Sequence, residues 1–318
     1  MNVKTTSLLI TRAYLLICAA IGILSAPASV WAQDSCMKYS WATALHAGTL
    51  QTTMDIDNDG NSYVTGVFTD TLIVGTDTLY GPANTPGRLH SFVARFSNDG
   101  QPVWIREIPG TGEIASCAVK VGDTGNIHIA GSFSGTASFG PETVSSVQPF
   151  YHDIFVSTLS PDGEFIATIT NNIVTNSSYS NESAIRSGIT PLALDGSGNL
   201  HMACLVDGRL EFDGIVMEGT NEVAFARLSN SGQWDWALMG GHYLGIGHAL
   251  TTDDIGNVYA FGKTENGSVF GNDTIWGSPL MPFYITKISP AGQWEWTKTI
   301  GRASMNTFSY ANALKVHP

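Results

Sequence analysis

One pattern occurs four times along this 318-residue chain, and it constrains the fold more than any other feature. Each copy opens with a Gly-Asn pair and a strand-like run. A second marker, an apolar residue followed by Gly or Asp, has its second residue fifteen positions after the first glycine. The offset of 15 is constant although the copies start 65, 73 and 58 residues apart, so each copy is a structural unit. The paired markers are Gly60-Asn61 with Val74-Gly75, Gly125-Asn126 with Phe139-Gly140, Gly198-Asn199 with Phe212-Asp213, and Gly256-Asn257 with Phe270-Gly271.

The second half of each copy predicts a hairpin. An alternating run such as Asp153–Leu159 indicates a strand with unlike faces. A tight turn follows, whose Gly, Asn and Asp residues supply the backbone angles and hydrogen bonds that hairpins need. The turns are Asn98-Asp-Gly100, Pro161-Asp-Gly163, Asn230-Ser-Gly232 and Pro290-Ala-Gly292, followed four residues later by Trp104, Ala167, Trp236 and Trp296.

Each copy therefore predicts four antiparallel strands. A sheet that is apolar on both faces must have both faces buried. If such sheets repeat around an axis, each sheet buries a face of the next one. We therefore expect an all-β fold, a β-propeller of four-stranded antiparallel blades with four recognisable repeats. A linear β-solenoid is the alternative, but its coils are much shorter than 60 residues. Charged residues are only 13% of the chain and glycines number 34, which argues against a helical bundle or coiled coil.

The two ends of the chain predict a split, incomplete fifth blade. The segment 39–45 is similar to the strand that carries the tryptophans, and 312–318 is similar to the first strand of a repeat. The middle pair of strands would be missing. Either the ring stays open or poorly closed, or the chain is part of a longer array; we favour the second, with the propeller domain at 33–318 incomplete at its C-terminus.

Residues 1–32 have the features of a secretory signal peptide. Lys4 and Arg12 precede an apolar run at 13–24, and small residues lead to a cleavage point after Ala32. No later segment is apolar enough to span a membrane, so we expect a secreted, cell-surface or periplasmic protein. The net charge of −12 disfavours nucleic acid as a partner. The mature chain keeps an odd number of cysteines, interpreted as buried thiols rather than a disulfide framework or zinc site: Cys36, Cys117 and Cys204.

The repeat resembles the bacterial SBBP-type β-propeller repeat over roughly residues 41–318. The pattern Asp-x-x-Gly-Asn-x-Tyr-Val-Thr-Gly-x-Phe is met most closely at 57–68, and the third copy departs from it at 203–206. The resemblance implies a secreted or surface scaffold, typical of Bacteroidetes. It supplies no catalytic residues and no cofactor.

Acidic and histidine side chains offer weak metal-site candidates. Asp55, Asp57 and Asp59 have a spacing that can place three carboxylates around Ca²⁺, but the later ligands of such a loop are absent, so turns stabilised by Asp are the favoured interpretation. His242 and His248 lie six apart without an acidic companion. His128 and His201 share the repeat position of Tyr63 and Tyr259, which indicates a structural position.

Tryptophans and one long loop offer binding candidates. Trp104, Trp236 and Trp296 share one repeat position, which favours packing between blades. Trp234 and Trp294 are the better candidates for exposed platforms that stack on carbohydrate. The polar loop at 170–187 could bind a partner, although a solvated excursion is favoured.

We therefore predict a non-catalytic binding or structural module of the bacterial surface, whose partner is an unidentified protein or glycan. No catalytic, cofactor-binding or metal residues are assigned, because Gly-x-Ser-x-Gly, HExxH, P-loop and dinucleotide motifs are absent from the sequence. The alternative is a carbohydrate-binding or carbohydrate-active propeller, a lectin, glycosidase or lyase, using exposed tryptophans or carboxylates of the ring channel.

Overall fold

The computed structural model describes residues 51–81, 88–147, 152–171, 173–174, 192–242, 249–276, 281–303 and 314–316. Every element within these ranges is a β-strand. None of them is a helix with the length and apolarity needed to cross a membrane. The predicted signal peptide and the segment 39–45 lie outside the described residues, as does all of 312–318 except 314–316, which form no strand.

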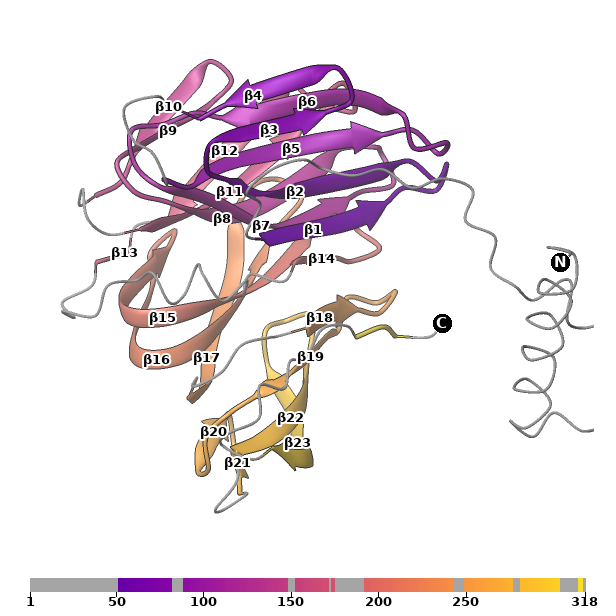
Figure 1. Ribbon diagram of the computed structural model, residues 1–318. Coiled ribbons are helices and arrows are strands. Elements are labelled where there is room, and N and C mark those ends of the chain that lie inside the picture. Colours follow the sequence, from indigo (N-terminus) through magenta and orange to yellow (C-terminus); the bar gives the residue numbers. More distant parts are fainter. Residues whose placement is uncertain are drawn as a thin grey trace, which may run out of the picture. The chain divides into compact units, whose positions relative to one another are not determined.

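Four antiparallel sheets form the four blades of a propeller, which confirms the predicted fold class (Figure 1). The second and third strands of each sheet pair with each other, and the first and fourth flank them. The first blade is β1 (Gln51–Ile56), β2 (Ser62–Phe68), β5 (His90–Phe96) and β6 (Pro102–Ile108); the second is β7 (Ile114–Val121), β8 (Ile127–Phe133), β11 (Asp153–Leu159) and β12 (Phe165–Asn171). The third is β14 (Leu192–Leu194), β15 (Leu200–Phe212), β16 (Ile215–Leu228) and β17 (Trp234–His242), with the short β13 (Ile173–Val174) also paired to β15; the fourth is β18 (Ala249–Thr252), β19 (Val258–Lys263), β22 (Met281–Ile288) and β23 (Trp294–Ala303).

Three small hairpins add to the four strands that the sequence predicts for each copy. They are β3 (Thr71–Val74) with β4 (Asp77–Tyr80), β9 (Thr136–Phe139) with β10 (Glu142–Ser145), and β20 (Ser268–Phe270) with β21 (Asp273–Ile275). The second marker of each repeat is the turn of its hairpin, because Gly75, Gly140 and Gly271 have φ of 61°, 62° and 59°. A glycine with positive φ at the first position of a two-residue turn matches the twist of the flanking strands.

The third blade carries the same feature in a different form. Its strands β15 and β16 run on past the blade to the turn, so the hairpin is continuous with the sheet. Here both turn residues, Asp213 and Gly214, have positive φ, 46° and 86°. An Asp-Gly pair supports a turn with two positive φ angles, which explains why this copy reads Phe-Asp instead of Phe-Gly.

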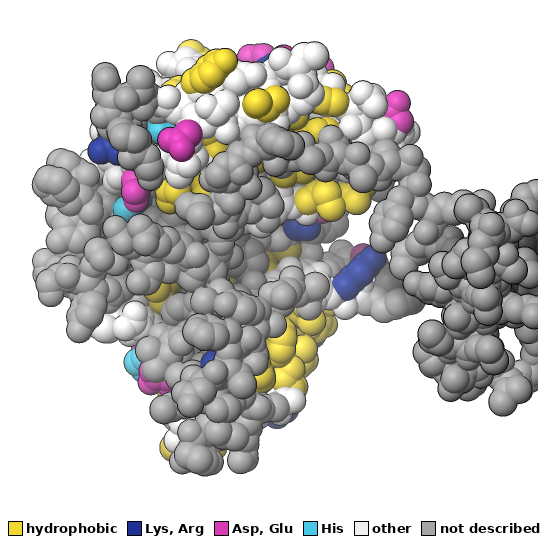
Figure 2. All heavy atoms as spheres, in the orientation of Figure 1, with side chains coloured by type: hydrophobic (Ala, Val, Ile, Leu, Met, Phe, Trp, Pro, Cys, Tyr) yellow, Lys and Arg dark blue, Asp and Glu magenta, His cyan; other side chains and the backbone are white. Residues whose placement is uncertain are grey.

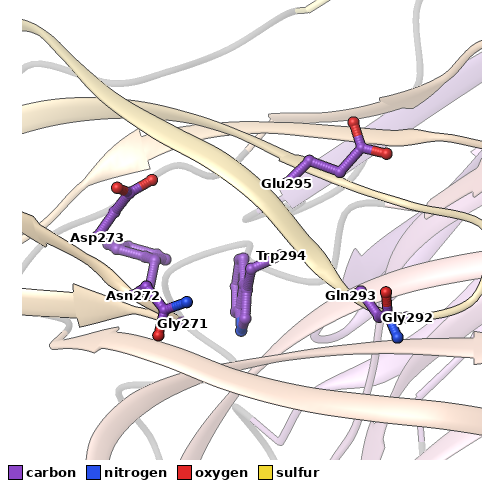
Figure 3. A pocket seen from close by; sticks show the side chains of 8 residues that line it. Gly271, Asn272, Asp273, Gly292, Gln293, Trp294 and Glu295 are labelled. Atoms are coloured by element: carbon purple, nitrogen blue, oxygen red, sulfur yellow. The ribbon is translucent and has the colours of Figure 1, made fainter.

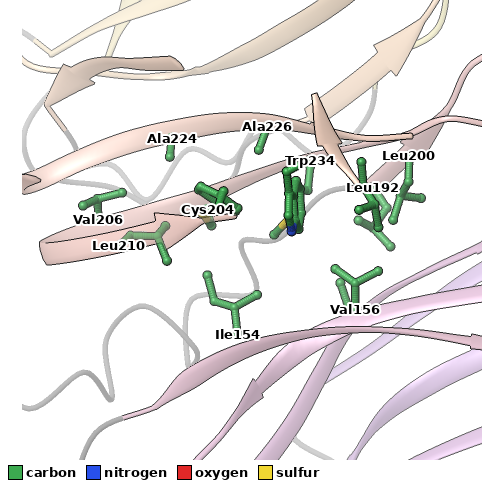
Figure 4. Packing of buried hydrophobic residues seen from close by; sticks show 14 of the residues in the cluster. Ile154, Val156, Leu192, Leu200, Cys204, Val206, Leu210, Ala224, Ala226 and Trp234 are labelled. Atoms are coloured by element: carbon green, nitrogen blue, oxygen red, sulfur yellow. The ribbon is translucent and has the colours of Figure 1, made fainter. Parts of the chain in front are cut away.

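The hydrophobic core lies between neighbouring blades. Ile154 and Val156 of the second blade belong to one buried cluster with Cys204, Leu210 and Trp234 of the third (Figure 4). Comparable clusters join the first blade to the second and the third to the fourth. Each fully buried large apolar side chain contributes about 1.5–3 kcal/mol, so the contacts between blades stabilise the fold.

Candidate functional site

The aspartate of the Asp-x-x-Gly-Asn turn closes the turn on itself. Asp57 Oδ1 accepts hydrogen bonds from the backbone N–H groups of Asp59 (3.0 Å) and Asn61 (2.8 Å). Its Oδ2 accepts from Asn61 Nδ2 (2.8 Å) and from the hydroxyl of Tyr63 (3.0 Å). The same arrangement recurs around Asp195 and Asp253. The carboxylate at this position therefore stabilises the turn in three of the four blades.

Two of the four repeats have a histidine at the tyrosine position, and one of these histidines joins the aspartate network. His201 Nε2 lies 3.1 Å from Asp195 Oδ2 in the third blade. In the second blade Gly122 replaces the aspartate, and His128 Nδ1 instead lies 3.1 Å from Thr158 Oγ1. Burial lowers the pKa of both imidazoles. Both contacts agree with the structural position that the sequence indicates.

The proposed calcium ligands are engaged by groups of the chain. Asp55 Oδ1 accepts from Lys120 Nζ (3.2 Å), and its Oδ2 accepts from the backbone N–H of Val121 (2.9 Å). The hydrogen bonds described above occupy Asp57, and Asp59 is exposed. Across the described ranges, no three His, Cys, Asp or Glu side chains are placed to hold a metal ion. Asp57 thus stabilises its turn, as the favoured interpretation expects, whereas Asp55 joins the first blade to the second.

Acid is expected to weaken the turn of the third blade. Burial acts to raise the pKa of Asp195, but hydrogen bonds from Asn199, His201 and the backbone outweigh it and leave that pKa below its usual value. Because the unfolded carboxylate takes up its proton first, the free energy of unfolding falls as pH drops below about 4. Asp195→Asn is expected to lower it by about 1–3 kcal/mol at pH 7, and less as pH falls.

Urea unfolding between pH 7 and pH 2.5 measures this effect. The control is Asp123→Asn, which changes an exposed carboxylate in the corresponding turn of the second blade. A loss for Asp195→Asn that stays constant over the pH range would contradict the account.

Tryptophans at the shared repeat position bind the turn of the following blade. Trp104 Nε1 donates to the carbonyl oxygen of Pro161 (3.1 Å), and Trp236 Nε1 donates to that of Pro290 (3.1 Å). An arginine on the neighbouring strand donates to the same oxygen in each case: Arg95 at 3.4 Å and Arg227 at 3.1 Å. We call each pair of tryptophan and arginine a Trp–Arg clamp. The predicted packing between blades is confirmed for these two tryptophans.

The clamp occurs where the next turn begins with proline. The second blade has Thr158 and Ala167 at the two clamp positions. The turn that packs on this blade begins with Asn230, and its Gly232 lies close to the side chain of Ile169. The chain has three described interfaces between consecutive blades. At each of them, the clamp is present when the turn of the next blade begins with proline and absent when it begins with asparagine.

Trp234 was predicted to be exposed, and this is wrong. It is 6% exposed and its ring lies 4.6 Å from that of Phe212. Trp294 is partly buried, with ring distances of 5.6 Å to Phe225 and 5.5 Å to Phe270. The hairpin at the second marker carries Phe212 or Phe270 against these rings, and Trp234 also belongs to the buried cluster with Ile154 and Val156 of the second blade. The constant spacing of 15 residues between the Gly-Asn pair and the second marker was the sequence signal that could have revealed this hairpin.

One pocket of about 430 Å³ lies beside Trp294 in the fourth blade. Figure 3 shows Asp273 and Glu295 on either side of the indole. Asp273 Oδ2 accepts from the backbone N–H of Thr297 (2.6 Å), and Glu295 pairs with Lys287 Nζ (2.7 Å). Each carboxylate is thus engaged separately. The lining residues are Phe270, Gly271, Asn272, Asp273, Gly292, Gln293, Trp294 and Glu295.

The remaining candidates from the sequence do not form a site among the described residues. His242 is exposed, with Nε2 3.9 Å from Glu222 Oε1, and His248 lies outside those residues, as does Cys36. Of the loop at 170–187, only 170–171 and 173–174 are described, and they belong to strands. Cys117 and Cys204 are buried, as predicted, and burial raises the pKa of the Cys204 thiol to about 12.

Comparisons with known proteins place the chain in no family. No family model matches it, and no curated protein does. Among solved structures, it is similar to a protein of unknown function from Bacteroides caccae, with 10% identity and a TM-score of 0.27, over 75% of this chain and 93% of the other. It is also similar to BBS1N, solved in complex with ARL6DN, with 10% identity and a TM-score of 0.24, over 83% and 94%. Neither likeness carries a function to this chain.

Proposed function

We propose that this chain is an exported bacterial β-propeller repeat protein of the SBBP type that acts as a non-catalytic binding or structural module at the cell surface. One observation carries the proposal. The aspartates, aromatic residues and turns that recur in the repeats are engaged in closing turns and joining blades. The protein is therefore a scaffold whose unengaged surfaces are free for partners.

Export is the part of this proposal that can be tested first. Expressed with residues 1–32 in a Gram-negative host, the chain is expected to lose them and to begin at Gln33, as read by N-terminal sequencing. Ala32→Arg should block cleavage, because the signal peptidase requires a small residue there. A chain that keeps its N-terminus and stays in the cytoplasm would contradict the proposal.

A carbohydrate-binding function is the second candidate, and the pocket beside Trp294 favours it. An aromatic ring flanked by the amides of Asn272 and Gln293 offers a stacking surface with hydrogen-bonding groups. A glycan array with Trp294→Ala tests it, with Trp276→Ala as the control because Trp276 is exposed and is not among the pocket's lining residues. Binding that is lost only with Trp294→Ala would replace the unidentified partner by a glycan.

A further inference from the structure

The pocket beside Trp294 lies where the tip of a hairpin meets the outer strand of the fourth blade (Figure 3). One wall is the turn between β20 and β21, with Phe270, Gly271, Asn272 and Asp273; the other is the turn before β23 and the start of that strand. All eight lining residues are among those that the structure describes (Figure 2 shows the described surface in colour). The volume of about 430 Å³ is within the range of small-molecule sites.

The same junction occurs in the other blades, but none of them combines an acid with a partly exposed tryptophan. The position of Trp294 is held by Pro102 in the first blade and by Phe165 in the second. In the third blade the tryptophan is Trp234, which is 6% exposed, and an isoleucine replaces Asp273. The repeat therefore forms this junction without such a pair.

The pocket carries negative charge. Its lining includes the carboxylates of Asp273 and Glu295 and no Lys, Arg or His. Glu295 is balanced by Lys287 Nζ at 2.7 Å, whereas none of the ion pairs among the described residues includes Asp273. Asp273 Oδ2 accepts from the backbone N–H of Thr297 (2.6 Å), which leaves Oδ1 for a donor in the pocket. The side chain is only partly buried, so a ligand can reach it, and an anion would be repelled.

The indole, the amides and the carboxylate recognise different parts of a ligand. A tryptophan ring attracts a cation to its face and also stacks on the apolar face of a sugar ring. The exposed amides of Asn272 and Gln293 can donate to hydroxyl groups and accept from them. Asp273 supplies a charged acceptor, which forms its strongest hydrogen bonds with a protonated amine.

We propose that this pocket binds an amino sugar through its protonated amine, which Asp273 holds beside the ring of Trp294. The inference rests on the carbohydrate-binding candidate above and names its ligand class. A neutral or N-acetylated sugar would cover the carboxylate without supplying a charged donor, which costs binding energy. A simple amine would leave the two amides and the ring face unused. An amino sugar engages all three kinds of group.

Two oligosaccharides that differ in one group provide the test: the trimer of chitosan, which has free amines, and the trimer of chitin, whose amines are acetylated. Calorimetric titration into the full chain at about pH 5.5, where the amines are protonated, is expected to show at least about tenfold tighter binding of the chitosan trimer. Asp273→Asn keeps an acceptor for Thr297 but removes the charge. It should weaken binding of the chitosan trimer roughly ten- to hundredfold and leave that of the chitin trimer unchanged. Trp294→Ala should abolish binding of both, with circular dichroism as the check that the blades stay folded.

The third blade supplies a matched control, because it carries an acid beside its own tryptophan. Asp235→Asn removes one negative charge next to the buried Trp234 and should leave both affinities unchanged. Spermidine, which has protonated amines but no ring, should bind at least about tenfold more weakly than the chitosan trimer.

Three results would overturn the proposal: equal affinity for the two trimers, binding of the chitosan trimer that Asp273→Asn does not weaken, or spermidine that binds as tightly. A neutral glycan that is bound through Trp294 in preference to the chitosan trimer would also overturn it, but would leave the carbohydrate-binding function standing. If no glycan binds, both the proposal and that function fail, whereas normal export would keep the surface module.

Discussion

Trp236→Ala is expected to lower the free energy of unfolding by about 3–5 kcal/mol, the usual effect of truncating a buried tryptophan. The ring fills the space between the third and fourth blades, and its Nε1–H donates to Pro290. Truncation leaves a cavity and removes the hydrogen bond to the turn. Urea unfolding followed by circular dichroism measures the difference.

The chain provides a matched control for this substitution. Trp296→Ala removes the same residue from the same repeat position, but in the fourth blade, where Trp296 is only partly buried. We expect a loss of about 1 kcal/mol or less. Equal losses for the two variants would contradict the view that the clamp stabilises the fold through the turn it binds.

Gly292→Ala is expected to destabilise the protein by about 2–5 kcal/mol through two effects that act together. The residue has φ of 72°, which an alanine adopts at a cost of about 1–2 kcal/mol. A Cβ atom would also lie 2.5 Å from Cγ of Trp236, so the turn could no longer sit against the ring; such overpacking typically costs about 1–3 kcal/mol. Thermal unfolding of the purified variant measures the sum.

Gly214→Ala separates the two effects. Gly214 has φ of 86°, and a Cβ there would meet nothing within 4 Å. Its substitution should therefore show the backbone effect alone, about 1–2 kcal/mol. If Gly292→Ala is no worse than Gly214→Ala, then the close approach of turn and tryptophan is not a source of stability.

The sequence predicts the blades well because their signals are local. The glycine of each Gly-Asn pair has positive φ, and the turn glycines do too, so the chain must reverse at those points. Strand limits then follow from the alternating runs between the turns. The shared position of Trp104 and Trp236 predicts contact between blades because a residue that recurs at one position of the repeat is expected to meet an equivalent neighbour in each copy.

The surroundings of single side chains could not be predicted in this way. Trp234 and Trp236 would share one face of a regular strand, and Trp234 was the candidate for exposure because only Trp236 holds the position shared between repeats. The pairing is irregular here, with Leu228 opposite Trp234 and Arg227 opposite Trp236, so the two rings lie in different buried clusters. Phe212 of the hairpin and Ile154 and Val156 of the second blade cover Trp234, so its burial depends on contacts that no local pattern encodes. The engagement of Asp55 by Lys120 and Val121 is likewise a contact between two blades.

Hydroxyl-radical footprinting read by mass spectrometry tests most directly whether the recurring aromatic residues bind neighbouring blades. One experiment on the intact protein compares the oxidation rates of all its tryptophans. The account predicts slow oxidation of Trp104 and Trp236, intermediate oxidation of Trp296, and fast oxidation of the exposed Trp276. Oxidation of Trp104 and Trp236 at the rate of Trp276 would contradict it.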